Sequence, residues 1–357
     1  MTAERNENLP LLSICVPTFN RARSLDNLFC NLADVKKVHG DRVEICVSDN
    51  QSTDHTAEVI SEWRDRLDLQ VQTQPHNIGG TLNIIAVTRL CRGRWTNLIG
   101  DDDEFDLPGL AALLDYLKGA GPDDWVLAGV AGKDGNEQVL RDLATGVYTK
   151  AAFRRRMIGT SLYPYGFMGL HVFPASARPV LAGLTLETGQ PWPHMATMLR
   201  QLETGRVHVF RPAIMVQAAS GVHLFWTASA LAQITLSKLR ILERTSEAVP
   251  AHRWFHRAMM IRELYSYDNL VLLLAWRLYE GESFRRAALP AYLTGYRRAG
   301  PLALLALPHL ALTSLLYVTP HIVLRGLMTL VGRGEYLSRY RDRKSSLKDF
   351  NGIERGI

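Results

Sequence analysis

Residues 95–106 read WTNLIGDDDEFD, so an apolar run leads directly into three consecutive aspartates. Carboxylates this close repel one another, and a partner must compensate for their charge. In isolation, such a run is more often a solvated loop than a metal site. Whether Asp101, Asp102 and Asp103 hold a cation therefore depends on what the rest of the chain brings beside them.

The same pattern, an apolar run that ends in polar residues, recurs through the first 130 residues. Buried strands are predicted at LLSICVP (11–17), VEICVSD (43–49), LQVQT (69–73), WTNLIG (95–100) and DWVLAGV (124–130). Helical patterns separate them at 23–38, 53–67, 79–90 and 108–118, and Ser52, Thr53 and Asp54 are N-cap candidates for the second. Strands that alternate with helices of this length predict an α/β fold with a mostly parallel sheet flanked by helices.

The second half of the chain has a different character. Residues 131–225 are less regular and predict a loop, a strand, a helix from about Pro193, and one or two further strands. Residues 226–247 and 252–280 predict helices without convincing strands. We therefore expect two domains, an α/β domain at 1–225 and a helical region at 226–357.

The helical region contains an uncharged stretch, residues 299–324, followed by a basic tail at 333–349. The stretch exceeds the ~20 residues that span a bilayer. Prolines at 301, 308 and 320 interrupt it, however, which favours helices that lie in the membrane interface. A buried helical hairpin or a dimer contact is the alternative.

Composition restricts the class of protein. The chain has 357 residues, 47% of them apolar and 21% charged, which is typical of a folded protein. Its net charge of +6 favours an anionic partner: a nucleotide, a phospholipid surface or nucleic acid. No C-x-x-C pair is present, and Cys15 and Cys46 lie inside apolar runs as expected for buried thiols. With a polar N-terminus that lacks an apolar signal segment, this pattern favours a cytoplasmic, reducing location.

Four polar clusters follow the predicted strands, and ligands of open parallel sheets bind at such strand ends. They are PTFNRAR (17–23), SDNQSTD (48–54), QPHNIGG (74–80) and GDDDEF (100–105). Each alone is explained as a turn, a helix cap or a loop. Because all four occur in order at strand ends, one shared site is the better explanation.

The segments VPTFNR, VSDNQSTD, HNIGG and GDDD, in this order, resemble the sugar-nucleotide-binding half of a family 2 glycosyltransferase. The resemblance covers about residues 11–225 and is strongest over 11–106. It implies the GT-A fold for the domain at 1–225. The helical extension at 226–357, which its apolar stretch and basic tail predict to be membrane-associated, lies outside the resemblance. The resemblance also implies an inverting enzyme of bacterial surface-glycan synthesis. Such an enzyme moves a sugar from a nucleotide-sugar donor to a hydroxyl of a lipid-linked or cell-surface glycan.

The resemblance also implies roles for individual residues. The loop after the first strand would hold the nucleotide, and Asp49 would contact its base or ribose. Asp103 would bind Mg²⁺ or Mn²⁺, with Asp101 or Asp102 on ribose or metal, because hard divalent cations prefer carboxylate oxygens. Gly100 stands where the family often has its first acidic residue, which leaves the register open. The residues expected to bind the nucleotide sugar are Pro17, Thr18, Asn20, Arg21, Asp49, Asn77, Asp101 and Asp102.

The general base is less certain. Related enzymes carry an acidic pair at a helix start, followed by Leu and Arg. PWPHMATMLRQL (191–202) keeps the Leu and the Arg but has a proline and His194 in place of the pair. His194 is therefore either the base or only a structural residue, and Glu187 is the other candidate base. His223 is a candidate ligand of the metal or phosphates, with a structural role as the alternative.

Two other functions remain open. A nucleotidyltransferase on a related fold should have a glycine-rich loop after the first strand, and PTFNRAR has no glycine. A catalytically degenerate membrane scaffold would explain the missing acidic pair, but the intact GDDD opposes it. The absence of a G-x-G-x-x-G motif after the first strand argues against a dinucleotide-dependent oxidoreductase. We expect a cytoplasmic enzyme, peripheral on the inner face of the membrane, without a nucleic-acid partner.

Overall fold

The computed structural model describes residues 9–132, 143–158, 162, 164–184, 192–201, 205–217, 238–239, 241–245, 247, 249–264, 274, 277–278, 304 and 307–330. The chain divides into two compact units. The first comprises Met1–Arg156 and Tyr163–Gly221, and the second comprises Met157–Leu162 and Val222–Ile357.

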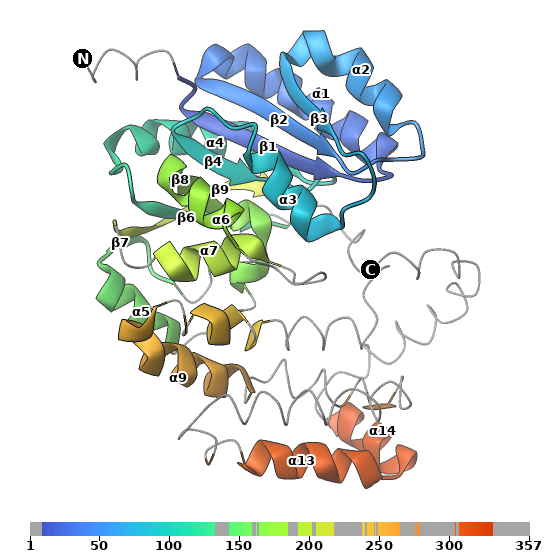
Figure 1. Cartoon of the computed structure of the whole chain (residues 1–357), viewed down its shortest axis with the longest axis vertical. Coiled ribbons are helices and arrows are strands. Elements are labelled where there is room, and N and C mark those ends of the chain that lie inside the picture. The colour runs from blue at the N-terminus through green and yellow to red at the C-terminus, as the bar shows by residue number, and fades with distance from the viewer. Residues whose placement is uncertain are drawn as a thin grey trace. The chain divides into compact units, whose positions relative to one another are not determined.

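The first unit alternates strands and helices (Figure 1). Its strands are β1 (Leu12–Thr18), β2 (Val43–Asp49), β3 (Leu69–Thr73), β4 (Trp95–Leu98), β5 (Glu104–Phe105), β6 (Trp125–Ala131), β7 (Gly146–Tyr148), β8 (His171–Pro174) and β9 (Val207–Val216). Its helices are α1 (Ala22–His39), α2 (Thr56–Leu67), α3 (Gly80–Thr88), α4 (Leu107–Tyr116), α6 (Arg178–Ala182) and α7 (Pro193–Gln201); α5 (Lys150–Ile158) crosses the boundary between the units. The α/β fold predicted from the sequence is confirmed.

The strands form one sheet in the order β3-β2-β1-β4-β8-β6-β9-β5, with β7 paired to β9. The strands from β3 to β4 are parallel, as their crossover helices predict. Beyond β4 the sheet is mixed, because β8 inserts antiparallel between β4 and β6. This pairing joins segments far apart in the chain, and it encloses the carboxyl end of β4 between β1 and β8.

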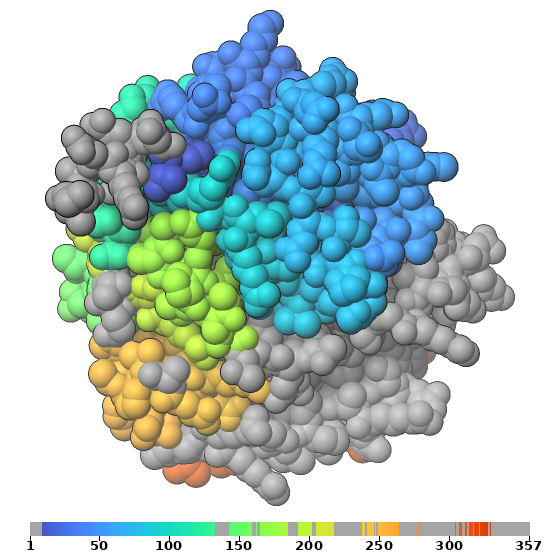
Figure 2. Space-filling view, turned by 45° about the horizontal axis from the view of Figure 1, so that its top comes forward, coloured from blue at the N-terminus to red at the C-terminus, as the bar shows by residue number. Residues whose placement is uncertain are grey.

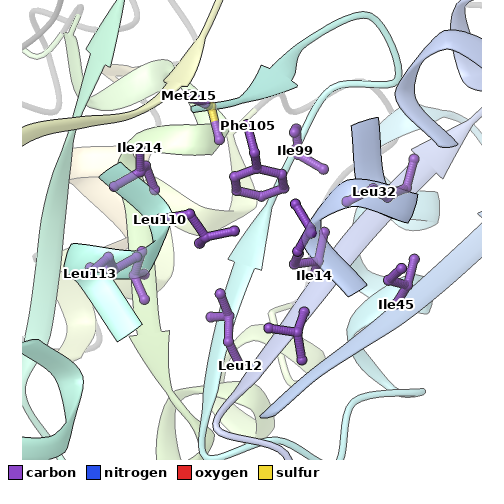
Figure 3. Close-up of a cluster of buried hydrophobic side chains, with 14 of the residues drawn as sticks. Leu12, Ile14, Leu32, Ile45, Ile99, Phe105, Leu110, Leu113, Ile214 and Met215 are labelled. Carbon is purple, nitrogen blue, oxygen red and sulfur yellow. The ribbon is translucent and has the colours of Figure 1, made fainter. Parts of the chain in front are cut away.

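One face of the sheet carries the main core. Leu12, Ile14 and Val16 of β1 are buried in the same apolar cluster as residues of α1, α2 and α4. Figure 3 shows Leu12 and Ile14 among leucines that include Leu110 and Leu32. Side chains on a strand alternate between faces, so Ser13 and Cys15 lie on the opposite face. There β1 and β2 contact α3, and α3 contacts α6 and α7. In Figure 2 the cyan surface of α3 lies beside the yellow-green surface of α6 and α7.

The second unit is helical where it is described. It contains α9 (Arg253–Leu264), α13 (Leu307–Val318) and α14 (His321–Leu330). Lys238 forms a buried ion pair with Glu263 at 3.1 Å. Arg277 donates to the carbonyls of Leu316 and Thr319 and so supplies partners to the C-terminal end of α13. Within the described segments, no helix combines the length and apolar character that crossing a bilayer requires.

Candidate active site

The carboxyl ends of β1 and β4 meet, and polar residues join them. Thr18, the last residue of β1, donates from Oγ1 to Asp101 Oδ2 at 2.8 Å. Arg21 approaches the same cluster, with Nε 3.8 Å from Asp101 Oδ1 and Nη2 3.6 Å from Asp102 Oδ2. The structure thus unites the loop after the first strand with the acidic cluster. Pro17 precedes the contact and pairs in register with Ser48 of β2.

The Asp101 carboxyl is held in an unfavourable environment for its charge. Burial raises the pKa of Asp101 to about 6, while Arg21 and the Thr18 hydroxyl act in the opposite direction. Only 7% of the residue is exposed. A buried carboxylate so close to Asp102 destabilises the fold, and a loop that served folding alone would gain nothing from it. Carboxylates with pKa values perturbed in this way are typical of ligand-binding sites.

The other two carboxylates turn toward Gly100. A Cβ atom at position 100 would lie 2.9 Å from Asp103 Oδ2 and 3.0 Å from Asp102 Oδ1. The missing side chain of Gly100 therefore leaves room for two carboxylate oxygens beside the same backbone segment. Asp103 is 6% exposed, and its backbone N–H donates to Gly100 O at 3.2 Å. Among the residues that the structure describes, no three Asp, Glu, His or Cys side chains form a ready metal site.

Asp49, the last residue of β2, is 2% exposed and stabilises the turn that follows it. Its Oδ1 accepts hydrogen bonds from the backbone N–H and the hydroxyl of Ser52. The same Ser52 Oγ accepts from Asn20 N at 2.9 Å, and Asn20 Oδ1 accepts from Thr53 N at 2.7 Å. Asn20 has a φ of 53°, a left-handed conformation that asparagine tolerates better than most residues. The loops after β1 and β2 thus form one connected surface.

The loop after β3 joins the same edge. Asn77 Oδ1 accepts from Asn50 Nδ2 at 2.8 Å and from Gly79 N at 2.9 Å. Asn50 Oδ1 in turn accepts from Ile78 N at 2.9 Å. Asn77 therefore orders the entry to α3.

One residue of this edge was not predicted from the sequence. Asn83 lies on α3, is 2% exposed, and donates to the carbonyls of Thr18 and Ser48 at 3.3 and 2.9 Å. Ser48 Oγ donates to Asn83 Oδ1 at 2.7 Å. The available signal was a lone amide in the apolar helical segment GGTLNIIAVT, because a buried amide must find hydrogen-bond partners.

His194 lies near the start of α7, where the sequence predicted a helix, and is 1% exposed. Its Nε2 donates to Gly166 O at 3.0 Å, since a carbonyl oxygen can only accept. Nδ1 is then the unprotonated nitrogen, and it has no hydrogen-bond partner among the described residues. Burial, and then the neighbouring His171 ring 4.8 Å away, lower the pKa of His194 well below its ordinary value. Glu187 and His223 lie outside the described residues.

Comparison with known proteins gives a family for the part of the chain that forms this edge of the sheet. The sequence profile described as Glycosyl transferase family 2 matches residues 13–177. Abequosyltransferase RfbV of Salmonella typhimurium is 36% identical over 109 residues, which are 30% of this chain and 32% of that protein. Validoxylamine A glucosyltransferase of Streptomyces hygroscopicus subsp. jinggangensis is 43% identical over 60 residues, 17% of this chain and 14% of that protein. The alignments thus span about a third or less of each relative.

Solved structures extend the likeness to the fold. The crystal structure of S. aureus TarS 1-349 in complex with UDP-GlcNAc aligns with a TM-score of 0.50 and 15% identity. The alignment covers 85% of this chain and 88% of that chain, and identity this low supports the fold alone. The profile match and the shared sheet lead to one assignment: the segment from residue 13 to residue 177 belongs to glycosyl transferase family 2 and has the GT-A fold.

Proposed function

We propose that this chain is an inverting, metal-dependent glycosyltransferase that moves a sugar from a nucleotide-sugar donor to a hydroxyl of a lipid-linked or cell-surface glycan. The observation that carries the proposal is the contact of Thr18 and Arg21 with Asp101 at the carboxyl edge of the parallel strands. Nucleotides bind at this edge in open α/β sheets. Relatives that match parts of this chain are named abequosyltransferase and glucosyltransferase, which supports the same reaction class.

The nucleotide end of the donor fits the surface that Asn20, Ser52 and Asp49 build. Asp49 offers a carboxylate that can accept from a ribose hydroxyl or a base N–H. Its hydrogen bonds from Ser52 fix its direction before the ligand arrives, which reduces the entropic cost of binding. Arg21 adds positive charge beside the aspartates, where the diphosphate would lie.

A divalent cation suits the acidic cluster. The fit rests on the donor set: Asp102 and Asp103 both turn a carboxylate oxygen toward Gly100, and hard cations prefer such oxygens. We assign Asp103 as the direct ligand, with Asp101 or Asp102 on ribose or metal, and His223 as a further candidate. When bound, Mg²⁺ or Mn²⁺ would neutralise negative charge on the diphosphate that leaves.

The transfer requires a single displacement. The acceptor hydroxyl oxygen attacks the anomeric carbon, the bond from that carbon to the diphosphate oxygen breaks, and a base takes the hydroxyl proton. A single displacement of this kind inverts the configuration at the anomeric carbon. His194 and Glu187 remain the candidate bases. The unprotonated Nδ1 of His194 is the atom that would take the proton, although burial disfavours the charged imidazolium that results.

A membrane-bound acceptor is supported by the second unit. Several apolar side chains of α13 and α14 are exposed, among them Leu315, Val318 and Ile322, the last at 80%. Arg325 is exposed on the same segment. An amphipathic surface of this kind suits the headgroup region of an anionic bilayer, which supports a peripheral location on the cytoplasmic face.

The decisive experiment follows release of nucleoside diphosphate from a panel of nucleotide sugars, with and without Mn²⁺, and determines the anomeric configuration of the product. Metal-stimulated turnover of one donor, with inversion, is expected. A nucleotidyltransferase would instead release pyrophosphate from a nucleoside triphosphate and a sugar phosphate. A scaffold would bind a nucleotide sugar without turning it over, and either result would overturn the proposal.

A further inference from the structure

Three thiols gather on the α3 face of the sheet, away from the main core. Cys15 of β1 and Cys46 of β2 are register partners in the parallel ladder, so their side chains share one face. Cys91 follows the end of α3. The Sγ atoms of Cys15 and Cys91 lie 3.0 Å apart, although 76 positions separate the two residues in the chain. The glycosyltransferase chemistry proposed above uses none of these thiols.

The three thiols differ in access. Cys15 and Cys46 are completely buried, whereas Cys91 is partly exposed. Arg178 fixes the backbone around Cys91, because its guanidinium donates to Cys91 O at 2.5 Å and to Gly93 O at 2.9 Å. Cys91 is therefore the least buried of the three cysteines in the cluster.

The surroundings also favour the thiolate of Cys91. Hydrogen bonds from Cys15 and then from Cys46 lower the pKa of the Cys91 thiol, and the positive charge of Arg178 adds to the effect. Burial, the largest cause, raises the pKa of the Cys15 thiol. A partly exposed thiolate is the form of cysteine that reacts with oxidants.

We propose that Cys91 is a site of oxidative modification by hydroperoxides and that Cys15 resolves it into an intramolecular disulfide. The Cys91 thiolate attacks the terminal peroxide oxygen, and the O–O bond breaks. Cys91 becomes a sulfenic acid, and the other peroxide oxygen leaves as an alkoxide or hydroxide that takes a proton from solvent to give an alcohol or water. The Cys15 sulfur then attacks the Cys91 sulfur, and the sulfenic oxygen leaves as water with the thiol proton. Two thiols lose two electrons in total, and the hydroperoxide gains them.

Geometry selects Cys15 rather than Cys46 as one end of the bond. An S–S bond is about 2.05 Å long, so the 3.0 Å contact closes by a small shift of the Cys91 loop. The bond would tie the end of α3 to the strand that carries Thr18.

The test uses the full-length Cys30→Ser protein, because Cys30 is exposed and would react independently. The folded protein is treated with hydrogen peroxide, unfolded, and alkylated with N-ethylmaleimide. We expect two of the three remaining thiols to be lost to alkylation, recovered by dithiothreitol, and linked in one peptide pair containing Cys15 and Cys91. Three alkylated thiols, or a linked pair that contains Cys46, would overturn the proposal.

Two variants sharpen the result. Cys46→Ser should still form the disulfide, since Cys46 is not part of it. Cys91→Ser should keep both remaining thiols available for alkylation after the same treatment. Loss of the disulfide in Cys46→Ser, or its formation in Cys91→Ser, would contradict the assignment. The peptide map of the Cys30→Ser protein decides the matter even if either variant fails to fold.

Discussion

The Thr18 hydroxyl donates a 2.8 Å hydrogen bond to the Asp101 carboxylate, across 83 positions of the chain. The contact links the end of β1 to the acidic cluster after β4. It exists because β1 and β4 are parallel neighbours whose carboxyl ends emerge at the same edge. Arg21 places its charge near the same carboxylate, so a hydrogen bond and an ion pair both join the loop after β1 to the acidic cluster.

Replacing Asp103 tests the proposed cation site. Asp103→Ala should fold, because it removes a carboxylate from a crowded acidic cluster. It should lose sugar transfer and bind the metal–nucleotide complex at least about 10²-fold more weakly, since even partners of metal ligands contribute 10–100-fold. Calorimetry with Mn²⁺ and nucleoside diphosphate measures this. Asp41→Ala, at an exposed carboxylate, is the control. Wild-type affinity in Asp103→Ala would remove Asp103 from the site.

Asp49 should act on the nucleotide independently of the metal. Asp49→Ala should weaken binding of the free nucleoside diphosphate about 10–100-fold, because a hydrogen bond to a charged group contributes roughly 1.5–3 kcal/mol. Asp49→Asn keeps an acceptor oxygen for Ser52 and separates the loss of charge from collapse of the turn. Titration without added metal is the measurement, and equal affinities for all three proteins would contradict the assignment.

Acid should destabilise the first unit partly through His171. Burial lowers the pKa of His171 to about 4, from about 6.5 in the unfolded chain. Between these values the unfolded state binds the proton and the folded state does not, so stability is full above pH 6.5 and falls as the pH drops toward 4. The free energy of unfolding falls by on the order of 3 kcal/mol at most, because each pKa unit between the folded and unfolded states corresponds to ~1.4 kcal/mol.

Urea unfolding at pH 7.5 and pH 5 measures that loss. His171→Gln retains hydrogen-bonding groups for Trp125 and Tyr165 and should show a smaller loss between the two pH values. His55→Gln, at an exposed histidine, should behave like the wild type. An unchanged loss in His171→Gln would assign the acid sensitivity to other groups.

Much of the site could be predicted because it follows from strand order. Adjacent parallel strands end at one edge, so the clusters around Asp49, Asn77 and the three aspartates had to meet. The pairings within the edge were not predictable, because Thr18–Asp101 and Asn83–Ser48 depend on exact register and on the path of α3.

The N-cap of α2 and the cysteine cluster show which features the sequence pattern could not predict. Helix α2 begins at Thr56, with His55 as its N-cap, rather than at the N-cap candidates Ser52, Thr53 or Asp54. Ser52 and Asp54 accept hydrogen bonds from the backbone N–H groups of Asn20 and Ala22, a tertiary demand that a local capping rule does not include. Asp54 also accepts from Thr56 N at the start of α2, so its side chain serves both segments. Cys15 and Cys46 are buried as predicted, but their meeting with Cys91 depends on the end of α3.

His194 has two explanations that a pair of variants distinguishes. If Nδ1 is the base, His194→Ala and His194→Gln should both lower turnover about 10²–10⁴-fold with little change in donor affinity. If the residue only supports Gly166, Gln retains a donor for that carbonyl and should restore turnover. Steady-state kinetics at saturating donor decides, and near-normal turnover in His194→Gln would direct attention to Glu187→Gln.

The membrane prediction rests on the exposed apolar side chains of α13 and α14 and on the basic residues that follow. A peripheral mode predicts that anionic liposomes bind the full-length protein better than neutral ones, because each basic residue near the surface contributes about 1 kcal/mol. High salt should weaken this binding without abolishing it.

Val318→Glu with Ile322→Glu places two charges on side chains that are 71% and 80% exposed, so the double variant should fold and should bind liposomes more weakly. Thr329→Glu, which adds a charge at an exposed polar residue of α14, is the control. Liposome flotation at low and high salt compares the proteins. If the full-length protein stays at the bottom of the gradient under every condition, α13 and α14 do not meet lipid, and the case for a lipid-linked acceptor loses its main support.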